Sequence, residues 1–160
     1  MTLQIEGLTK RFGAHTLFRG LELRVEGPAV LWAPSGWGKT TLLRILMGLE
    51  RPDAGSVTGV GRVAAVFQED RLCPQLTAVE NVLLVLPDGR ARRGGVEADF
   101  ARLGMTGDAL TLPAARLSGG QKRRAALLRA VWARADTRLF DEPFTGLDPA
   151  AMEQAAALLR

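Results

Sequence analysis

The sequence predicts an α/β fold, because segments with strand-like and helix-like spacing follow one another along the chain. Apolar and polar residues alternate around residues 3–5 and 21–25, as in strands with one buried face. An apolar run at residues 29–33 then leads through a Gly-containing turn into helical spacing at residues 42–46. A short strand at residues 139–141 again precedes a helix. Strands that alternate with helices indicate an α/β sheet, and we expect a helical insert between its two halves.

Start and stop signals mark the elements between these two ends. Gly48 is a stop signal for the first helix, and residues 62–68 have the pattern of another buried strand. Thr77 and Glu80 form a capping box ahead of an apolar run, so a helix is expected to begin there. Residues 96–103 have a second, weaker helical pattern.

Two further helix starts lie in the C-terminal part of the chain. Ser118 and Gln121 form another capping box, which opens a long helix rich in Ala, Leu and Arg. Asp148 is placed to cap the last helix, and Pro149 occupies its first position, where no amide donor is needed.

The composition is that of a globular protein. Of the 160 residues, 47% are hydrophobic and 24% are charged, which argues against disorder, and the length suits a single domain. No apolar run approaches the roughly 18 residues that a membrane span needs, and residues 1–30 show no signal peptide. Because Cys73 is the single cysteine, it has no internal disulfide partner, and we expect a reducing cytoplasm.

The formal net charge of +4 does not by itself indicate nucleic-acid binding. The arginines are scattered, and only Arg90, Arg92 and Arg93 crowd together, in a Gly-flanked segment that is expected to be a loop. A second basic run, residues 122–124, is explained by the motif around it. We therefore expect no nucleic-acid partner.

The segment APSGWGKTT, from Ala33 to Thr41, has the composition of a phosphate-binding loop between a strand and a helix. In that setting successive amides and the helix N-terminus present partial positive charge to an anion. Lys39 would reach the β- and γ-phosphates, and the Thr40 hydroxyl would ligate Mg²⁺. The strict pattern begins with glycine where Ala33 stands, a small change if the backbone keeps a negative φ. The residues predicted to contact the nucleotide are Ser35, Gly36, Trp37, Gly38, Lys39, Thr40 and Thr41.

Two alternatives stay open for this loop. It could be an ordinary strand–turn–helix with a surface lysine at Lys39, although its context favours a phosphate site. Trp37 could touch the nucleotide, but its position in the loop is a variable one, which favours packing or solvent contact.

An acidic pair, Asp141 and Glu142, follows the strand at residues 139–141. Phosphoryl transfer needs an acid in the magnesium shell, which suits Asp141, and a group that positions the attacking water, which suits Glu142. Thr137 and Arg138 interrupt the apolar residues before the pair, which suggests an edge strand or one that is wet at its start. The pair is informative only together with the phosphate loop.

The segment Leu117-Ser118-Gly119-Gly120-Gln121 resembles, residue for residue, the signature of ATP-binding cassette (ABC) ATPases. A serine and two glycines at a helix N-terminus also make a second anion site, with a hydroxyl, bare amides and the helix dipole. The resemblance covers nearly the full length, and the stretch VFQEDRLCPQLTAVENV is most similar to importers of the nitrate, sulfonate and taurine group.

This resemblance implies roles for further residues. Phe12 stands where an aromatic residue, more usually tyrosine, stacks on adenine. Gln68 stands where a glutamine senses Mg²⁺ and the attacking water and touches the membrane partner. Asp148 belongs to a loop that crosses the dimer interface, and Ser118, Gly120 and Gln121 would contact the nucleotide of a partner subunit. The implied metal ligands are Thr40, Gln68 and Asp141, and the implied catalytic residues are Glu142, Gln68 and Lys39.

The resemblance also implies an architecture. It is a P-loop NTPase with a RecA-like core, an N-terminal antiparallel β subdomain and a helical insert. The expected parts are residues 1–69 for the β subdomain and phosphate loop, 70–117 for the helical subdomain, and 118–160 for the signature helix, acidic strand and last helix. The implied partners are ATP, Mg²⁺, a second ABC subunit packed head to tail, membrane permease subunits on the inner face of the cell membrane, and an optional extracytoplasmic substrate-binding protein.

One expected feature is missing from the sequence. The family places a switch histidine on a strand after the acidic pair, whereas the only histidine here is His15. We therefore expect the C-terminal strands to be absent, a gap in the sheet, and a chain that binds nucleotide but hydrolyses it poorly. A nucleotide-binding dimerisation module with little turnover is thus the alternative to an importer ATPase. A soluble relative in translation or DNA repair is disfavoured, because neither tandem cassettes nor long coiled-coil insertions are visible.

Overall fold

The computed structural model describes residues 2–159, and only the backbone of Arg90. Contacts divide the chain into two compact units, one ending at Val63 and one beginning at Ala64. Each unit has its own buried residues and is described by itself.

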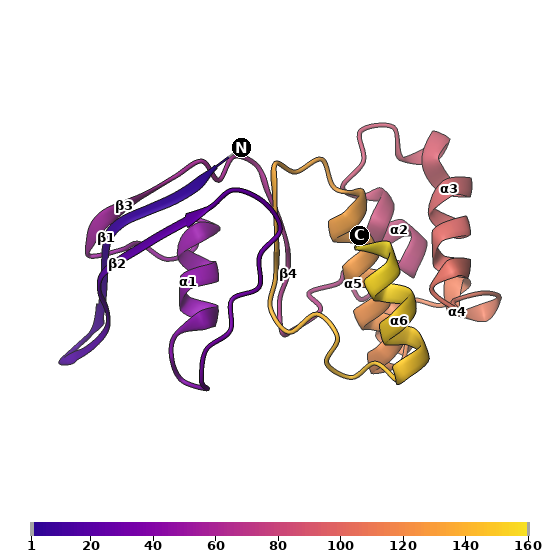
Figure 1. The fold of residues 1–160 in the computed structure, drawn as a ribbon. Helices are drawn as coiled ribbons and strands as arrows, with labels where there is room; N and C mark the ends of the chain where they lie inside the picture. Colours follow the sequence, from indigo (N-terminus) through magenta and orange to yellow (C-terminus); the bar gives the residue numbers. More distant parts are fainter. Residues whose placement is uncertain (1, 160) are drawn as a thin grey trace. The chain divides into compact units, whose positions relative to one another are not determined.

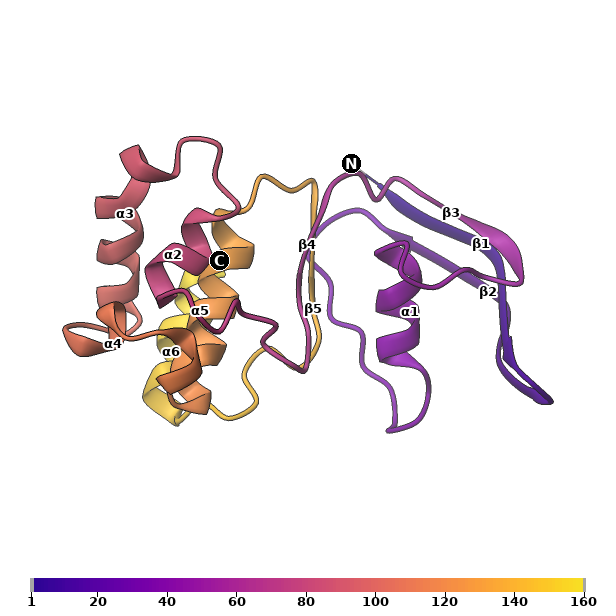
Figure 2. The ribbon, with the colours of Figure 1, turned by 180° about the vertical axis from the view of Figure 1, so that it is seen from behind.

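The N-terminal unit is an antiparallel sheet with one helix beside it (Figures 1 and 2). Strands β1 (Leu3–Phe12), β2 (His15–Val25) and β3 (Ala54–Thr58) are ordered β2-β1-β3. The alternation in the sequence is the reason, because inward-facing Leu3, Ile5 and Leu8 are buried while their neighbours are not. Helix α1 (Lys39–Leu46) buries Leu42, Ile45 and Leu46, and the chain turns at Gly48 as predicted. The antiparallel β subdomain is thus confirmed.

The C-terminal unit holds a two-stranded sheet and the remaining helices. Its strands are β4 (Val63–Val66) and β5 (Thr137–Phe140), and its helices are α2 (Ala78–Leu83), α3 (Gly89–Arg102), α4 (Asp108–Thr111), the 3₁₀ turn η1 (Ala114–Arg116), α5 (Gly119–Trp132) and α6 (Pro149–Leu158). A single cluster of buried apolar side chains joins them, with Phe100, Leu127 and Leu128 fully enclosed. The three predicted helix starts are confirmed, since Thr77, Ser118 and Asp148 each cap their helix.

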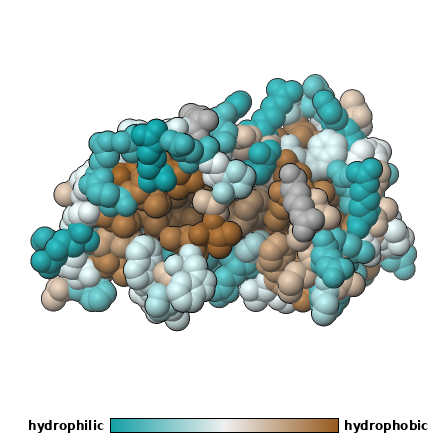
Figure 3. Space-filling model, in the orientation of Figure 1, coloured by the Kyte–Doolittle hydropathy of each residue, from teal (hydrophilic) through white to brown (hydrophobic). Residues whose placement is uncertain are grey.

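The strand predicted at residues 29–33 is wrong. No strand or bridge forms there, and Val30 and Trp32 are 92% and 87% exposed. An apolar run becomes a strand only where a neighbouring strand accepts from its N–H groups and donates to its C=O groups, and the sheets of residues 2–159 contain β1 to β5 alone. The surface carries other apolar area as well, which gathers in patches on the face drawn in Figure 3.

The loop predicted around Arg92 and Arg93 is also wrong, because these residues lie in α3, which begins at Gly89 rather than near residue 96. Arginine is a good helix former, and Arg93 pairs with Glu97 one turn later at 3.0 Å. Gly95 packs close to α5, where an added Cβ would lie 3.0 Å from the Trp132 ring. Tertiary packing therefore outweighs the helix-weakening effect of the glycines.

Asn81 ties the loop before α2 to the helix itself. It is fully buried, accepts a hydrogen bond from the Cys73 N–H at 2.8 Å, and donates to the carbonyls of Cys73 and Thr77 at 3.1 and 2.9 Å. Asn81→Ala removes these partners inside the core. We expect the free energy of unfolding to fall by about 2–3 kcal/mol, measured by urea denaturation. Gln75→Ala, at an exposed position of the same loop, is the control. Equal stability of the two variants would contradict this role.

Candidate functional site

The predicted phosphate loop leads directly into α1. Gly38 is the N-cap, with φ +102°, and its carbonyl accepts the first helical bond, from Leu42 N–H at 2.8 Å. No side chain caps this helix end, so its first-turn amides are not engaged by a capping group. An uncapped helix N-terminus that follows a glycine-containing turn can bind an anion.

Gly38 is required for two reasons. Its φ lies in the left-handed region, and an added Cβ would lie 2.8 Å from both Leu17 and Phe18. Gly36 also has a positive φ, +79°, but no atom lies within 4 Å of its missing Cβ. The two glycines therefore differ, because Gly38 permits close packing on β2 whereas Gly36 leaves open space on the loop.

Lys39 folds back over the loop. Its Nζ donates to the carbonyl of Ala33 at 2.8 Å and to that of Pro34 at 3.1 Å. Two loop carbonyls therefore hold the Lys39 ammonium against the loop. Ala33 is not among the residues with positive φ, so its methyl group replaces the usual glycine without backbone strain.

Trp37 and Phe12, the two aromatic residues of the predicted nucleotide site, both belong to the N-terminal unit. Trp37 packs on Phe18, with ring centroids 5.2 Å apart, a contact that agrees with the packing interpretation of Trp37. Phe12 ends β1, is half exposed, and has the Lys10 ammonium 5.0 Å from its ring centroid. Buried Lys10 also pairs with Glu50 at 2.7 Å and donates to the Arg51 carbonyl. The Lys10 ammonium that these partners hold thus lies over the Phe12 ring.

The acidic pair lies at the end of β5, in the C-terminal unit. The Asp141 N–H donates to the carbonyl of Val66, the last residue of β4, at 2.9 Å. Gln68 follows β4 and is exposed. Glu142 is exposed, with a left-handed φ of +49°, and accepts a 3.3 Å hydrogen bond from the Thr145 hydroxyl. Pairing of β4 with β5 therefore brings the Gln68 segment and the acidic pair to neighbouring strands.

The signature segment begins α5. Ser118 Oγ accepts from the Gln121 N–H at 3.3 Å, and Gln121 Oε1 accepts from the Ser118 N–H at 2.8 Å. A Cβ on Gly120 would lie 3.4 Å from the Gly146 carbonyl, so the signature lies beside the Gly146–Asp148 loop. Asp148 uses one carboxylate oxygen to cap α6 through the Ala151 N–H, at 2.9 Å.

The predicted residues thus form two groups. The phosphate loop and Phe12 belong to the N-terminal unit, whereas Gln68, the signature, the acidic pair and Asp148 belong to the C-terminal unit. Among residues 2–159 no cluster of three or more His, Cys, Asp or Glu side chains is arranged to hold a metal ion. No helix in that range is long and apolar enough to span a membrane.

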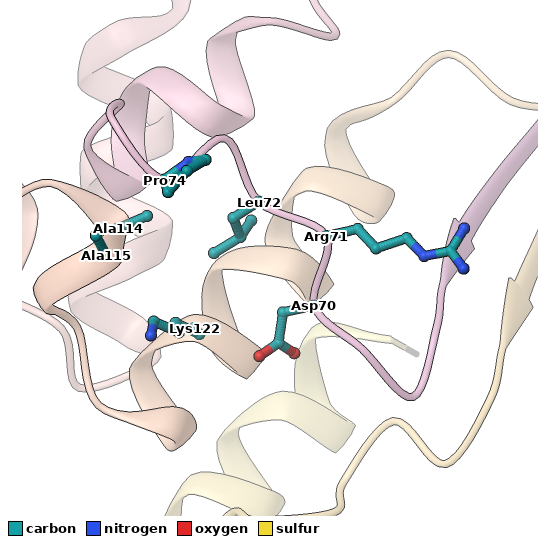
Figure 4. Close-up of a pocket in the computed structure, with 7 residues that line it drawn as sticks. All are labelled: Asp70, Arg71, Leu72, Pro74, Ala114, Ala115 and Lys122. Carbon is teal, nitrogen blue, oxygen red and sulfur yellow. The ribbon is translucent and has the colours of Figure 1, made fainter.

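A pocket of about 270 Å³ lies next to the Gln68 segment (Figure 4). Its walls come from the loop that follows β4, from η1 and from the first turn of α5, and the lining residues are Asp70, Arg71, Leu72, Pro74, Ala114, Ala115 and Lys122. Asp70 Oδ1 lies 3.3 Å from Arg123 Nη1 but accepts no hydrogen bond. Burial raises the pKa of Asp70, and the positive charge of Arg123 opposes that effect.

This raised pKa predicts a pH dependence of stability. Between the ordinary pKa of an aspartate and the raised value, the folded chain binds more protons than the unfolded one, so stability falls as pH increases. Asp70→Asn removes the titration. We expect its free energy of unfolding, relative to wild type, to increase from about pH 4 to neutral pH. Urea denaturation at several pH values measures this difference, and a difference that decreases with pH would contradict the direction of the shift.

Sequence reasoning missed Arg123, which it treated as part of an ordinary basic run. The side chain is buried and donates to the carbonyls of Phe67 at 2.6 Å and Gln68 at 2.7 Å. A signal was available, because Arg123 shares the spacing i, i+3, i+4, i+7 with Ala126, Leu127 and Ala130. A charged residue on the apolar face of a helix indicates a buried partner.

The sequence profile of the ABC transporter family matches residues 21–145, which span the phosphate loop, the signature and the acidic pair. The chain belongs to the ABC transporter family. It is 45% identical over 150 residues to the aliphatic sulfonates import ATP-binding protein SsuB 1 of Nocardia farcinica, covering 92% of this chain and 61% of that protein. It is 39% identical to the Fe(3+) ions import ATP-binding protein FbpC 1 of Rhodococcus jostii, covering 91% of this chain and 47% of that protein.

The fold of this ABC family member matches solved cassettes. The dimeric post-hydrolysis structure of the ATP-binding cassette MJ0796, bound to ADP and Pi, superposes with a TM-score of 0.81 at 25% identity, covering 98% of this chain and 81% of that one. The predicted P-loop NTPase fold is confirmed. The predicted likeness to the sulfonate group of importers is confirmed too, since SsuB proteins are among the relatives. The chain spans about 60% of the length of these SsuB relatives.

Proposed function

We propose that this chain is the ATP-binding and ATP-hydrolysing subunit of an importer. The observation that carries the proposal is the presence of two glycine-containing helix N-termini in one chain, one without a side-chain cap and one closed by a capping box. They are α1 behind the loop from Ser35 to Gly38, and α5 behind Ser118. Family membership and the names of the import ATP-binding relatives support the same function.

The residues divide the chemistry between them. The phosphates would bind to the first-turn amides of α1 and to four residues of the loop and helix start, Ser35, Gly36, Gly38 and Thr41. Lys39 would exchange its loop carbonyls for β- and γ-phosphate oxygens. Phe12 would stack on the base, and Trp37 of the loop packs on Phe18. Glu142 would accept a proton from the attacking water. Ser118, Gly120 and Gln121 would complete the site of a second copy, and Asp148 would lie at the interface between the copies.

Mg²⁺ fits the residues present. Thr40, Asp141 and Gln68 supply hydroxyl, carboxylate and amide oxygens, and the ion accepts few protein ligands when phosphates provide the others. When bound, Mg²⁺ neutralises charge that develops on the phosphate oxygens. Thr40, Asp141 and Gln68 would hold the ion, and Gln68 would also orient the attacking water.

We further propose that membrane permease subunits hold the chain on the inner face of the membrane and contact it beyond Gln68, with a substrate-binding protein outside. The names of the relatives cover aliphatic sulfonates and Fe(3+) ions, so the solute is assigned to those partners rather than to this chain. A binding module with little turnover is not favoured, because both kinds of relative carry importer names.

A complementation experiment tests the proposal. Lys39→Ala removes the phosphate-loop cation, and Gly119→Asp puts a carboxylate at the start of α5, where an added Cβ meets no atom within 4 Å. Each variant alone should release little phosphate from Mg-ATP. An equal mixture should recover about one quarter of the wild-type rate, because half of the dimers are mixed and each has one intact site. A wild-type chain without turnover would favour the binding module, and absent recovery would contradict the head-to-tail sandwich.

A further inference from the structure

Arg123 is a buried cation on the signature helix. It lies in the second turn of α5, five residues after the Ser118 cap, and is 5% exposed. A buried guanidinium is tolerated only when its N–H groups and its charge are matched by partners. Its partners all belong to the segment that follows β4.

Four carbonyls of that segment accept hydrogen bonds from two arginines of α5. Arg123 donates to Phe67 O at 2.6 Å and to Gln68 O at 2.7 Å. Arg129 donates to Asp70 O at 3.1 Å and to Arg71 O at 2.9 Å. Residues 67–71 form neither strand nor helix, so these side chains replace the partners that regular structure would supply.

The conformation of the segment is costly without such support. Arg71 has a left-handed φ of +46°, and its guanidinium lies 3.9 Å from the Phe67 ring centroid. Figure 4 shows Asp70 and Arg71 on this segment, with the Arg71 side chain extending away from the other residues of the pocket. The paired Arg123 bonds thus fix the backbone on both sides of the Phe67–Gln68 peptide.

We propose that Arg123 is a positioning residue that holds Gln68 in place relative to the signature end of α5. Its effect on nucleotide rests on the proposed role of Gln68 as a ligand of Mg²⁺ and water. The planar guanidinium fork satisfies two successive carbonyls at once, whereas a lysine ammonium at the same place is a single point charge on a flexible stem. Substitutions should therefore have graded effects, with lysine between arginine and methionine.

Arg124 offers a matched control. It is the next residue of the same helix and donates to Gly120 O at 3.2 Å and Leu103 O at 2.8 Å, not to the Gln68 segment. Arg124→Met thus removes an arginine and its backbone bonds from α5 while leaving residues 67–71 in contact with Arg123. A role of Arg123 in stability alone would give the same results for both variants.

The experiment uses the full chain as wild type, Arg123→Met, Arg123→Lys, Arg124→Met and Gln68→Ala. Hydrogen exchange is followed at the amides of residues 67–72, and calorimetry gives the affinities for Mg-ATP and Mg-ADP. In Arg123→Met we expect these amides to exchange at least about tenfold faster, because the segment opens more often once the charge-assisted bonds to its carbonyls are lost. The ratio of Mg-ATP to Mg-ADP affinity should fall as far as in Gln68→Ala, and Arg124→Met should resemble wild type in exchange at residues 67–72.

The outcomes separate this inference from the proposed function. The inference is overturned if the amides of residues 67–72 exchange equally fast in Arg123→Met and Arg124→Met. It is also overturned if Gln68→Ala lowers the ratio of Mg-ATP to Mg-ADP affinity while Arg123→Met leaves that ratio at the wild-type value. If Gln68→Ala leaves the ratio unchanged, the role given to Gln68 in the proposed function fails, and exchange still decides whether Arg123 holds the segment. If Arg123→Met does not fold, Arg123→Lys takes its place. Faster exchange than wild type at residues 67–72 then supports the inference, and exchange at the wild-type rate overturns it.

Discussion

Loss of turnover with retained binding is the expected result of Glu142→Gln. The substitution preserves size and the acceptor for the 3.3 Å hydrogen bond from Thr145, but the neutral amide cannot take a proton from water. We expect the single-turnover rate of phosphate release to fall by about 10²–10⁴-fold from that of wild type. The affinity for Mg-ATP should stay within about threefold, because the phosphate-loop residues are untouched.

Glu153→Gln is the control for Glu142→Gln. It makes the same chemical change at an exposed position of α6 and should hydrolyse at the wild-type rate. Equal single-turnover rates of phosphate release for Glu142→Gln and Glu153→Gln would show that Glu142 takes no part in hydrolysis. A parallel loss of Mg-ATP affinity in Glu142→Gln would instead assign it to binding.

Lys39→Ala is expected to have the second large effect, on affinity for Mg-ATP. In the structure the ammonium donates to Ala33 O and Pro34 O, and in the proposed nucleotide complex it would donate to phosphate oxygens instead. A charge-assisted contact with phosphate in a partly buried loop is worth about 3 kcal/mol, which corresponds to a loss of about 10²-fold in affinity. Calorimetric titration with Mg-ATP measures it directly.

Arg44→Ala separates the Lys39 effect from a general loss of positive charge. Arg44 is an exposed cation in the last turn of the same helix, far from its N-terminal end. Its replacement should leave the affinity within about twofold of wild type. Retention of wild-type affinity by Lys39→Ala would show that this loop does not bind phosphate through its lysine.

Local signals in the sequence determined much of the structure. Thr77, Ser118 and Asp148 cap the helices they were predicted to cap, because a cap depends on residues within one turn of each other. The alternation in β1 and the antiparallel subdomain were likewise predictable. The ordered motifs, from the phosphate loop to the signature, are sufficient to identify the family.

Contacts between distant residues account for what the sequence did not determine. The apolar run at residues 29–33 has the composition of a strand, yet a strand also needs a paired neighbour, which composition does not supply. The arginines near residue 92 lie in α3, in which Gly95 lies close to Trp132 of α5, a contact that composition does not predict. The helical spacing of Arg123 indicates burial, but only the folded structure identifies the carbonyls of Phe67 and Gln68 as its partners. Capping and alternation are local and can be read along the chain, whereas pairing and the burial of charge depend on which segments meet in space.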